Sequence, residues 1–367
     1  MGHQRLGVAV IGGGRIGRLR ARLAAIHPAV DFVAVSDADG ERACAVAGEA
    51  GAHFHTTDNL AAIERPEVNA VIVSTSESQH TEPVVQALAL GKSVLVEKPM
   101  AMSLADADRM LAAARTSGAD FRVGYARRFK RSFLLAKEQA ASGRLGDIVG
   151  ATFRAYNSRA QTLEVLRRSP DASPVAFGMT YYVDMLGWFL PDNPVVEVVA
   201  RGRRGALQEA GFDTDDVTWA LLTLADGTVV SMNIDYALPA NYPTFGTSSR
   251  VELLGTKGVV LIDDDSRDQI VYTDEGIPHS YVPGHHLNFA FMSSTAYGDW
   301  IQGEFWGPLA DETRSWLDHL ATGRPCSVTT GAEGRRTLEV TYAVEEASRT
   351  GKVVKLPRAG YTDGDTR

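Results

Sequence analysis

The sequence predicts an α/β protein of two domains, in which a helix-covered parallel sheet is followed by an α+β domain with a large, mostly antiparallel open sheet. Its 367 residues exceed what one hydrophobic core usually organises. In roughly the first third of the chain, short β-branched runs alternate with helical patterns. Beyond Arg128, the apolar runs are instead separated by turn signals.

The first domain is predicted from strands that lack an in-and-out alternation of apolar residues. Strands of this kind, separated by helices, form a parallel sheet that is covered on both faces. Helices are expected at residues 14–26, 81–90 and 103–116, and His27-Pro28 ends the first of them. The apolar runs occupy residues 8–11, 32–35, 70–73, 94–96 and 121–123.

The second domain follows a helix predicted at residues 129–141. Turn signals such as Asp226-Gly227 separate its apolar runs, which indicates antiparallel strands. Late helices are expected at residues 309–320 and 335–348, where apolar residues recur at three and four spacing. The predicted domains span residues 1–125 and 126–357, and residues 358–367 are expected to form a frayed tail.

Composition and charge argue against several classes of function. The formal net charge of -8 gives no electrostatic reason to bind nucleic acid or an anionic membrane. No apolar run is long enough to span a bilayer, and the two cysteines have no disulfide or redox spacing, so we expect a cytoplasmic protein. The histidine pairs at residues 53–55 and 285–286 lack a third ligand at a recognised offset, so no metal site is expected.

A glycine-rich turn follows the first strand directly. Gly12, Gly14 and Gly17 satisfy the pattern G-x-G-x-x-G at the junction of strand and helix. Gly12 allows the tight turn, Gly14 lets the backbone approach a pyrophosphate, and Gly17 lets the helix pack on the sheet. The helix amino terminus, with Arg15 and Ile16, then faces the anion. The pattern predicts a Rossmann dinucleotide-binding domain.

Asp37 ends the second strand about twenty residues after Gly17. A carboxylate at this place can accept hydrogen bonds from the adenosine ribose hydroxyls and would repel a 2′-phosphate. No arginine occurs between Asp37 and Arg42, so the sequence favours NAD over NADP. Alternatively, Asp37 only caps the helix that starts near Asp39.

Lys98 lies between an apolar strand and Pro99, which places it at the carboxyl edge of the parallel sheet. Ligands bind at that edge in sheets of this kind. A lysine near a turn is more often simply solvated, so its position alone leaves its role open.

Four segments taken together resemble the Gfo/Idh/MocA family of oxidoreductases, and the resemblance spans nearly the whole chain. It implies that Lys98 lies near the nicotinamide and the reacting hydroxyl. The segments are the glycine-rich turn, residues 73–80, residues 87–99 and residues 124–129. Further positions that line the cofactor by this resemblance are Ser74, Thr75, His80, Glu97 and Arg127.

The second catalytic element of the family differs here. Many members carry an aspartate, a histidine four residues later and a second aspartate three residues further on. An ungapped match places Phe177 at the first aspartate, Tyr181 at the histidine and Asp184 at the last aspartate. A tyrosine replaces the histidine in some members too. If residues 179–190 form a helix, Tyr181 and Asp184 face the same side.

A phenol is chemically able to exchange the substrate proton. An adjacent ammonium such as Lys98 would favour the phenolate and bring Tyr181 toward a useful range. Tyr125 and Tyr182 are the alternative phenols. Equally, Tyr181 and Tyr182 can be packing residues of a buried helix.

The second domain also offers candidate substrate ligands. Asn157, with Arg154 three residues before it, ends an early strand where family members place substrate-binding residues. A structural asparagine at a strand end fits nearly as well. Tyr236, Tyr297 and Trp300 could wall a sugar, although such aromatic residues more often belong to a core. Taken together, the residues expected to bind the substrate are Lys98, Tyr125, Arg154, Asn157, Tyr181 and Asp184.

These features predict a nicotinamide-dependent dehydrogenase, and the resemblance implies a cyclic polyol, sugar or sugar derivative as substrate. Phe177 keeps open a dehydrogenase of a non-sugar ring, such as an aromatic cis-dihydrodiol or a hydroxymuconic semialdehyde derivative. An NAD-binding sensor without chemistry is a third hypothesis, against which the presence of Lys98 speaks. An open sheet usually finds a partner, so we expect a homodimer or homotetramer through the second domain.

Overall fold

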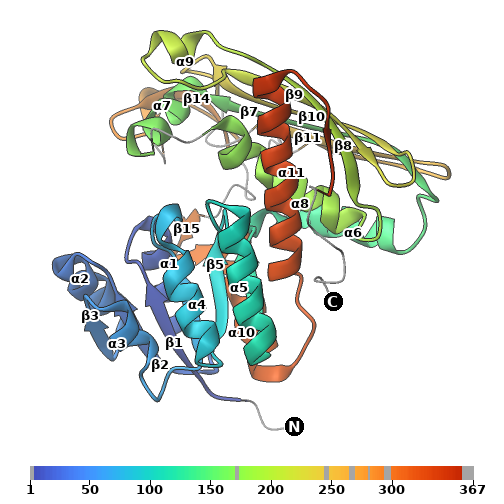
Figure 1. Ribbon diagram of the computed structural model, residues 1–367. Coiled ribbons are helices and arrows are strands. Elements are labelled where there is room, and N and C mark those ends of the chain that lie inside the picture. The colour runs from blue at the N-terminus through green and yellow to red at the C-terminus, as the bar shows by residue number, and fades with distance from the viewer. Residues whose placement is uncertain are drawn as a thin grey trace. The chain divides into compact units, whose positions relative to one another are not determined.

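A computed structural model describes residues 4–169, 173–243, 248–263, 269–279, 282–292 and 299–357 (Figure 1). The chain divides into two compact units, each with its own sheet and hydrophobic core. The first unit combines residues 1–129 with residues 297–338, and the second combines residues 130–296 with residues 339–367. The predicted tail at residues 358–367 and the candidate Tyr297 lie outside the described residues.

A seven-stranded sheet forms the centre of the first unit, in the order β17-β6-β5-β4-β1-β2-β3. All pairs from β6 to β3 are parallel, and only the edge strand β17 is antiparallel, as the absence of alternation predicts. The strand order reverses at β1, and ligands of such sheets bind at the carboxyl ends beside that reversal. The strands are β1 (Leu6–Ile11), β2 (Val30–Ser36), β3 (Phe54–Thr56), β4 (Ala70–Val73), β5 (Ser93–Glu97), β6 (Phe121–Gly124) and β17 (Thr329–Thr330).

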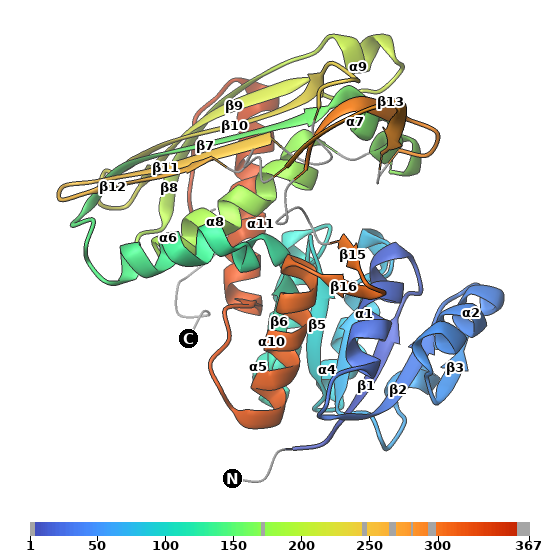
Figure 2. The same ribbon diagram turned by 180° about the vertical axis from the view of Figure 1, so that it is seen from behind.

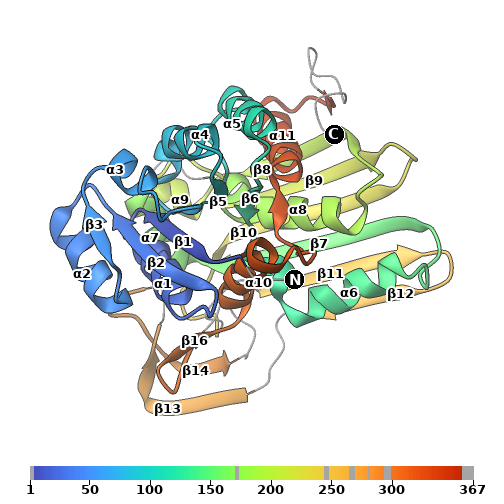
Figure 3. The ribbon, with the colours of Figure 1, turned by 90° about the horizontal axis from the view of Figure 1, so that it is seen from below.

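Helices cover both faces of this sheet, with α4 and α5 on one side and α1 and α10 on the other (Figure 3). Side-chain caps begin three helices, since Asp39, Asp58 and Ser103 accept hydrogen bonds from backbone N–H groups of the first turns of α2, α3 and α5. The helices are α1 (Arg15–Ala25), α2 (Gly40–Ala50), α3 (Asn59–Ile63), α4 (Thr81–Ala89), α5 (Leu104–Ser117) and α10 (Pro308–Thr322).

The helix α10 corrects the predicted domain division. Residues 126–357 were assigned to the second domain, yet residues 297–338 return to the first unit. Trp316 of α10 is fully buried in the same core cluster as Val8 and Leu95, and its indole N–H donates to Asp120 at 3.0 Å. A stretch of chain late in the sequence therefore completes the core of the first unit.

The second unit is built on another seven-stranded sheet, in the order β12-β11-β7-β10-β9-β8-β18. Only β7 and β10 pair in parallel, so the prediction of a mostly antiparallel sheet is confirmed. The strands are β7 (Ile148–Ser158), β8 (Val195–Arg203), β9 (Val217–Leu224), β10 (Val229–Leu238), β11 (Ser248–Gly255), β12 (Val259–Asp263) and β18 (Val354–Lys355). The remaining strands pair as β13 (Gln269–Pro278) with β14 (His286–Met292), and β15 (Asp299–Ile301) with β16 (Glu304–Trp306).

Helices cover one face of the second sheet (Figure 2). The covered face buries Phe153 and Ile234, which alternate along their strands with residues of the other face. That other face is the open face of the second sheet. It exposes Trp219, Leu221, Val229, Leu254, Val259 and Leu261. The helices are α6 (Arg131–Ala141), α7 (Arg159–Arg168), α8 (Thr180–Phe189), the short α9 (Ala206–Glu209), and α11 (Gly331–Thr350), which runs from the first unit into the second. Among the described residues, no helix is long and apolar enough to cross a membrane.

Candidate active site

The glycine-rich turn between β1 and α1 has the geometry that its sequence pattern predicts. Gly12 adopts φ +95°, and a Cβ there would lie 2.7 Å from the Ser74 carbonyl carbon. A Cβ on Gly17 would lie 1.8 Å from the Gly12 carbonyl oxygen. Both positions therefore require glycine, Gly12 for the turn and Gly17 for the contact between helix and strand.

The amino terminus of α1 fits a pyrophosphate. Gly14 occupies the N-cap position, no side chain caps the helix, and its first turn has no acidic residue. A Cβ on Gly14 would meet no atom of the described chain within 4 Å, so a ligand can approach the backbone closely at this residue. Arg15 is exposed and Ile16 half-buried at the same turn. Ser74 Oγ at the end of β4 is buried and makes no hydrogen bond with the described residues, which leaves a hydroxyl for a ligand oxygen.

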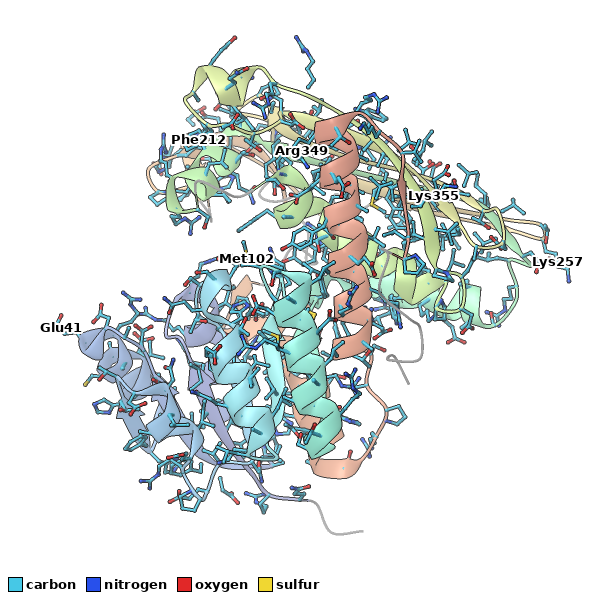
Figure 4. All side chains as sticks on the ribbon, viewed as in Figure 1. Glu41, Met102, Phe212, Lys257, Arg349 and Lys355 are labelled. Carbon is cyan, nitrogen blue, oxygen red and sulfur yellow. The ribbon has the colours of Figure 1, made fainter. Side chains whose placement is uncertain are left out.

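The Asp37 carboxylate ties the end of β2 to this turn. It accepts hydrogen bonds from the backbone N–H of Gly13 at 2.7 Å and of Asp39 at 2.9 Å. Asp39 rather than Asp37 caps α2, whose first turn is marked by Glu41 in Figure 4, so the capping alternative for Asp37 is wrong. Arg42 pairs with Asp39 at 3.0 Å and approaches Asp37 at 3.5 Å, so its charge is offset by two carboxylates.

Lys98 lies half-buried in the turn after β5, and Met102 shortly after it is exposed (Figure 4). The imidazole of His80 holds this turn from the interior. His80 is 1% exposed; its Nδ1 lies 3.0 Å from the Pro99 carbonyl oxygen and its Nε2 lies 3.3 Å from the Thr75 carbonyl oxygen. Burial lowers the pKa of His80, and a neutral imidazole can donate to only one of these carbonyls. The side chain of His80 therefore acts on the backbone of the turn.

The carboxylate of Glu97, the residue before Lys98, is bonded to the interior of the first unit. Arg20 donates to Glu97 Oε1 from Nε at 2.9 Å and from Nη2 at 2.7 Å. Sequence reasoning did not find Arg20. The signal that could have revealed it is its place three residues after Gly17 and three before Leu23, on the inward face of α1.

Two more candidates of the first unit follow β6. Tyr125 is 1% exposed and Arg127 is 3% exposed, within the short turn that includes the 3-10 helix at Ala126–Phe129. Lys130 is extended, so the helix predicted at residues 129–141 begins only at Arg131. Both candidates are thus buried residues close to the carboxyl edge of the parallel sheet.

In the second unit, Tyr181 and Asp184 lie on α8 as the helical spacing predicts. Phe177 precedes them in a π-helical turn, Val175–Met179, which the sequence did not indicate. Such turns are frequent at functional sites. Phe177 and Tyr181 are half-buried and Asp184 is 1% exposed. Lys98 belongs to the first unit, whereas Tyr181 and Asp184 belong to the second.

Tyr182 belongs to the core instead. It is 1% exposed, and its ring meets Phe153 edge to face with centroids 6.3 Å apart. Tyr236, which the sequence offered as a wall of a sugar site, is likewise buried in this core. It therefore follows the alternative expectation, that such aromatic residues belong to a core. The side chain of Trp300 lies outside what is described.

The structure does not bring Arg154 and Asn157 together. Asn157 is 8% exposed, and its Oδ1 makes no hydrogen bond with the described residues. Arg154 alternates to the opposite face of β7, where its guanidinium stacks 4.5 Å above the Tyr156 ring and donates to Ser248 Oγ at 3.4 Å. Arg154 is therefore a residue of the open face, and only Asn157 remains a substrate candidate on this strand. Among the described residues no cluster of three or more metal-ligating side chains occurs.

Comparisons with known proteins match both units. A family model described as an oxidoreductase family with an NAD-binding Rossmann fold matches residues 6–125. A model of the GFO/IDH/MocA C-terminal domain matches residues 133–261.

Curated relatives and solved structures cover almost the whole chain. An inositol 2-dehydrogenase of Acidothermus cellulolyticus is 31% identical over 86% of this chain and 89% of its own length. A myo-inositol 2-dehydrogenase of Thermotoga maritima is 27% identical over 95% and 98%. The crystal structure of scyllo-inositol dehydrogenase from Lactobacillus casei, with bound NAD(H) and scyllo-inositol, has a TM-score of 0.79 at 19% identity, over 96% of this chain and 99% of that one.

Proposed function

The chain belongs to the Gfo/Idh/MocA family of oxidoreductases, and we propose that it is an NAD-dependent dehydrogenase of a cyclic polyol such as an inositol. Hydride moves between the nicotinamide and a secondary alcohol or ketone of the ring. The observation that carries the proposal is the turn after β5 that contains Lys98. His80 holds this turn at the same edge of the sheet as the glycine-rich turn. The relatives named inositol 2-dehydrogenases support the substrate class.

The first unit supplies the groups that would hold the cofactor. The backbone N–H groups at the start of α1 and the Ser74 hydroxyl suit the pyrophosphate. Asp37 suits the ribose hydroxyls, because a carboxylate accepts hydrogen bonds from both. When bound, NAD supplies the hydride acceptor or, reduced, the hydride donor.

Lys98, Tyr181 and Asp184 carry the chemistry of the substrate oxygen in this proposal. The Lys98 ammonium stabilises the negative charge that develops on that oxygen. Tyr181 in its phenolate form, or a water, takes the hydroxyl proton, and Asp184, three residues further along the same helix, orients the Tyr181 side chain. Asn157 offers its buried Oδ1 to another hydroxyl of the ring.

The proposal includes NAD rather than NADP. A 2′-phosphate beside Asp37 would place two anions against each other. Arg42, which approaches Asp37, is already engaged by Asp39 and Asp37, so it does not offset that repulsion.

Phe177 favours a second candidate function, which is also enzymatic: a dehydrogenase of a non-sugar ring. The reason is that a half-buried aromatic side chain stands where many family members carry aspartate. A panel of inositols, other sugars and aromatic cis-dihydrodiols, followed by NADH absorbance, separates the two. Turnover of an inositol supports the main proposal; turnover of dihydrodiols alone would replace it.

The same assay tests the role of Lys98. Lys98→Met is expected to lower kcat at least about a hundredfold with NADH still bound, since one preorganised charge is worth about 2.7–4 kcal/mol. Lys355→Met, at an exposed lysine labelled in Figure 4, is the matched control. A wild type that binds NADH and turns over no member of the panel would favour a sensor instead.

We also propose that the open face of the second sheet binds a second copy of the chain. Its aliphatic and aromatic side chains include Trp219 at 53% and Leu261 at 67% exposure, and an uncovered sheet face of this kind is unusual in a monomer.

A further inference from the structure

A buried arginine is bonded to the residue that precedes Lys98. Arg20 on α1 is fully buried, and its Nε and Nη2 donate to Glu97 at 2.9 and 2.7 Å. Its Nη2 also donates to Glu312 on α10, and its Nη1 donates to Thr313 Oγ1 at 2.7 Å. The planar guanidinium thereby ties α1 to α10 and to the last residue of β5.

The end of β6 packs against this ion pair. Glu97 lies opposite Gly124 in the pairing of β5 with β6. A Cβ on Gly124 would lie 3.1 Å from Arg20 Nη2 and 3.2 Å from Glu97 Oε2. The Glu97 side chain retains 16% exposure. Two hydrogen bonds and close packing therefore hold the carboxylate on the interior side of the strand.

We infer that Arg20 is a positioning residue that keeps the Glu97 carboxylate away from the neighbouring Lys98 ammonium. The inference rests on the role proposed for Lys98. A carboxylate within a few ångströms of an ammonium favours the charged amine and offsets its field. A released Glu97 would thus compete with the substrate oxygen for the charge of Lys98. Arg20 prevents this competition by giving Glu97 a buried partner of its own.

A merely stabilising role for Arg20 predicts different behaviour. Breaking a buried ion pair from either side costs stability, because it leaves an uncompensated charge. Glu312 is as buried as Arg20 and bonds the same guanidinium, but it stands on α10 rather than beside Lys98. If Arg20 only stabilises the fold, Glu312→Gln and Arg20→Met should affect Lys98 in the same way.

The experiment compares Arg20→Met, the double variant Arg20→Met/Glu97→Gln and the control Glu312→Gln. The first readout is the rate at which acetic anhydride acetylates Lys98, measured by peptide mass spectrometry with Lys355 as internal reference. Only the unprotonated amine reacts, so a freed carboxylate slows the reaction. We expect Arg20→Met to slow it at least about threefold, the double variant to restore it, and Glu312→Gln to leave it unchanged.

The second readout is turnover with NAD and an inositol. Arg20→Met is expected to lower kcat at least about tenfold with little change in the Kd of NADH. If Arg20→Met does not fold, Arg20→Lys is used in its place, because an ammonium cannot reproduce the set of hydrogen bonds that the planar guanidinium donates. The inference would be overturned if Lys98 were acetylated at the wild-type rate in a folded Arg20 variant. It would also be overturned if Glu312→Gln slowed the acetylation as much as the Arg20 variant does. A wild type without turnover would instead refute the proposed function, while the acetylation rates still decide the role of Arg20.

Discussion

Three glycines of the first unit differ in the space around them, and the difference separates cofactor binding from folding. A Cβ on Gly17 would lie 1.8 Å from the Gly12 carbonyl oxygen, where real contacts essentially never fall under 3.0 Å. α1 must therefore move off β1 by about 1 Å in Gly17→Ala, at a cost of about 1–3 kcal/mol. A Cβ on Gly14 or on Gly48 in α2 would meet no atom of the described chain within 4 Å.

The three alanine variants should consequently behave in three ways. Gly17→Ala lowers the free energy of unfolding and weakens NADH binding together. Gly14→Ala lowers the free energy of unfolding by at most about 1 kcal/mol, because it only exchanges the N-cap residue for a poorer one, but its methyl group occupies the path of the pyrophosphate. We expect its Kd for NADH to rise at least about tenfold, equivalent to about 1.4 kcal/mol. Gly48→Ala gains about 0.5–1 kcal/mol of stability with an unchanged Kd, since alanine is the better helix former.

Urea unfolding gives the free energies, and titration of NADH fluorescence gives the dissociation constants. The reasoning is refuted if Gly14→Ala binds NADH within about twofold of the wild type, because the backbone at this turn would then not approach the cofactor. It is equally refuted if Gly14→Ala and Gly17→Ala lose the same stability, since the free space around Gly14 would then have no consequence.

Three further outcomes are expected. Asp37→Ala should lower kcat/KM for NAD and raise the ratio of NADP to NAD use, because the carboxylate that repels a 2′-phosphate is gone; an unchanged ratio in steady-state assays would contradict the assignment. Leu221→Asp on the open sheet face should shift the mass found by sedimentation toward the monomer, whereas Leu135→Asp, an equally exposed leucine on α6, should not. Burial lowers the pKa of His279 to about 4, with His285 contributing, so the folded state binds fewer protons than the unfolded state between this value and about 6.5. The free energy of unfolding should therefore be complete above pH 6.5 and fall as the pH drops toward 4, and His279→Gln should flatten that slope in urea titrations at several pH values.

Five strands of the first unit lie close to the bounds that the sequence predicts. The strand at residues 70–73 was predicted with its observed bounds, and the other four predicted strands were extended by only a few residues. The steric reasons given for Gly12 and Gly17 agree with the contacts of the turn. Strand period, proline and glycine are local signals, because they act through the backbone of a few neighbouring residues.

The candidate site was predicted less completely. The sequence placed Tyr181 and Asp184 on one helix, since a spacing of three suffices for that, but it gave no sign of the π-helical turn before them. It assigned Arg154 and Asn157 to one site, although three residues along a strand place them on opposite faces.

Local pattern thus determined the kind of fold, the dinucleotide turn and the place of Lys98. Tertiary contacts decided the rest: α10 joins the first unit from nearly two hundred residues away, His80 bonds the backbone at Pro99, and Arg20 meets Glu97 and Glu312. An ion pair or a buried contact depends on which distant elements pack together, and residue spacing within one segment carries no record of that packing.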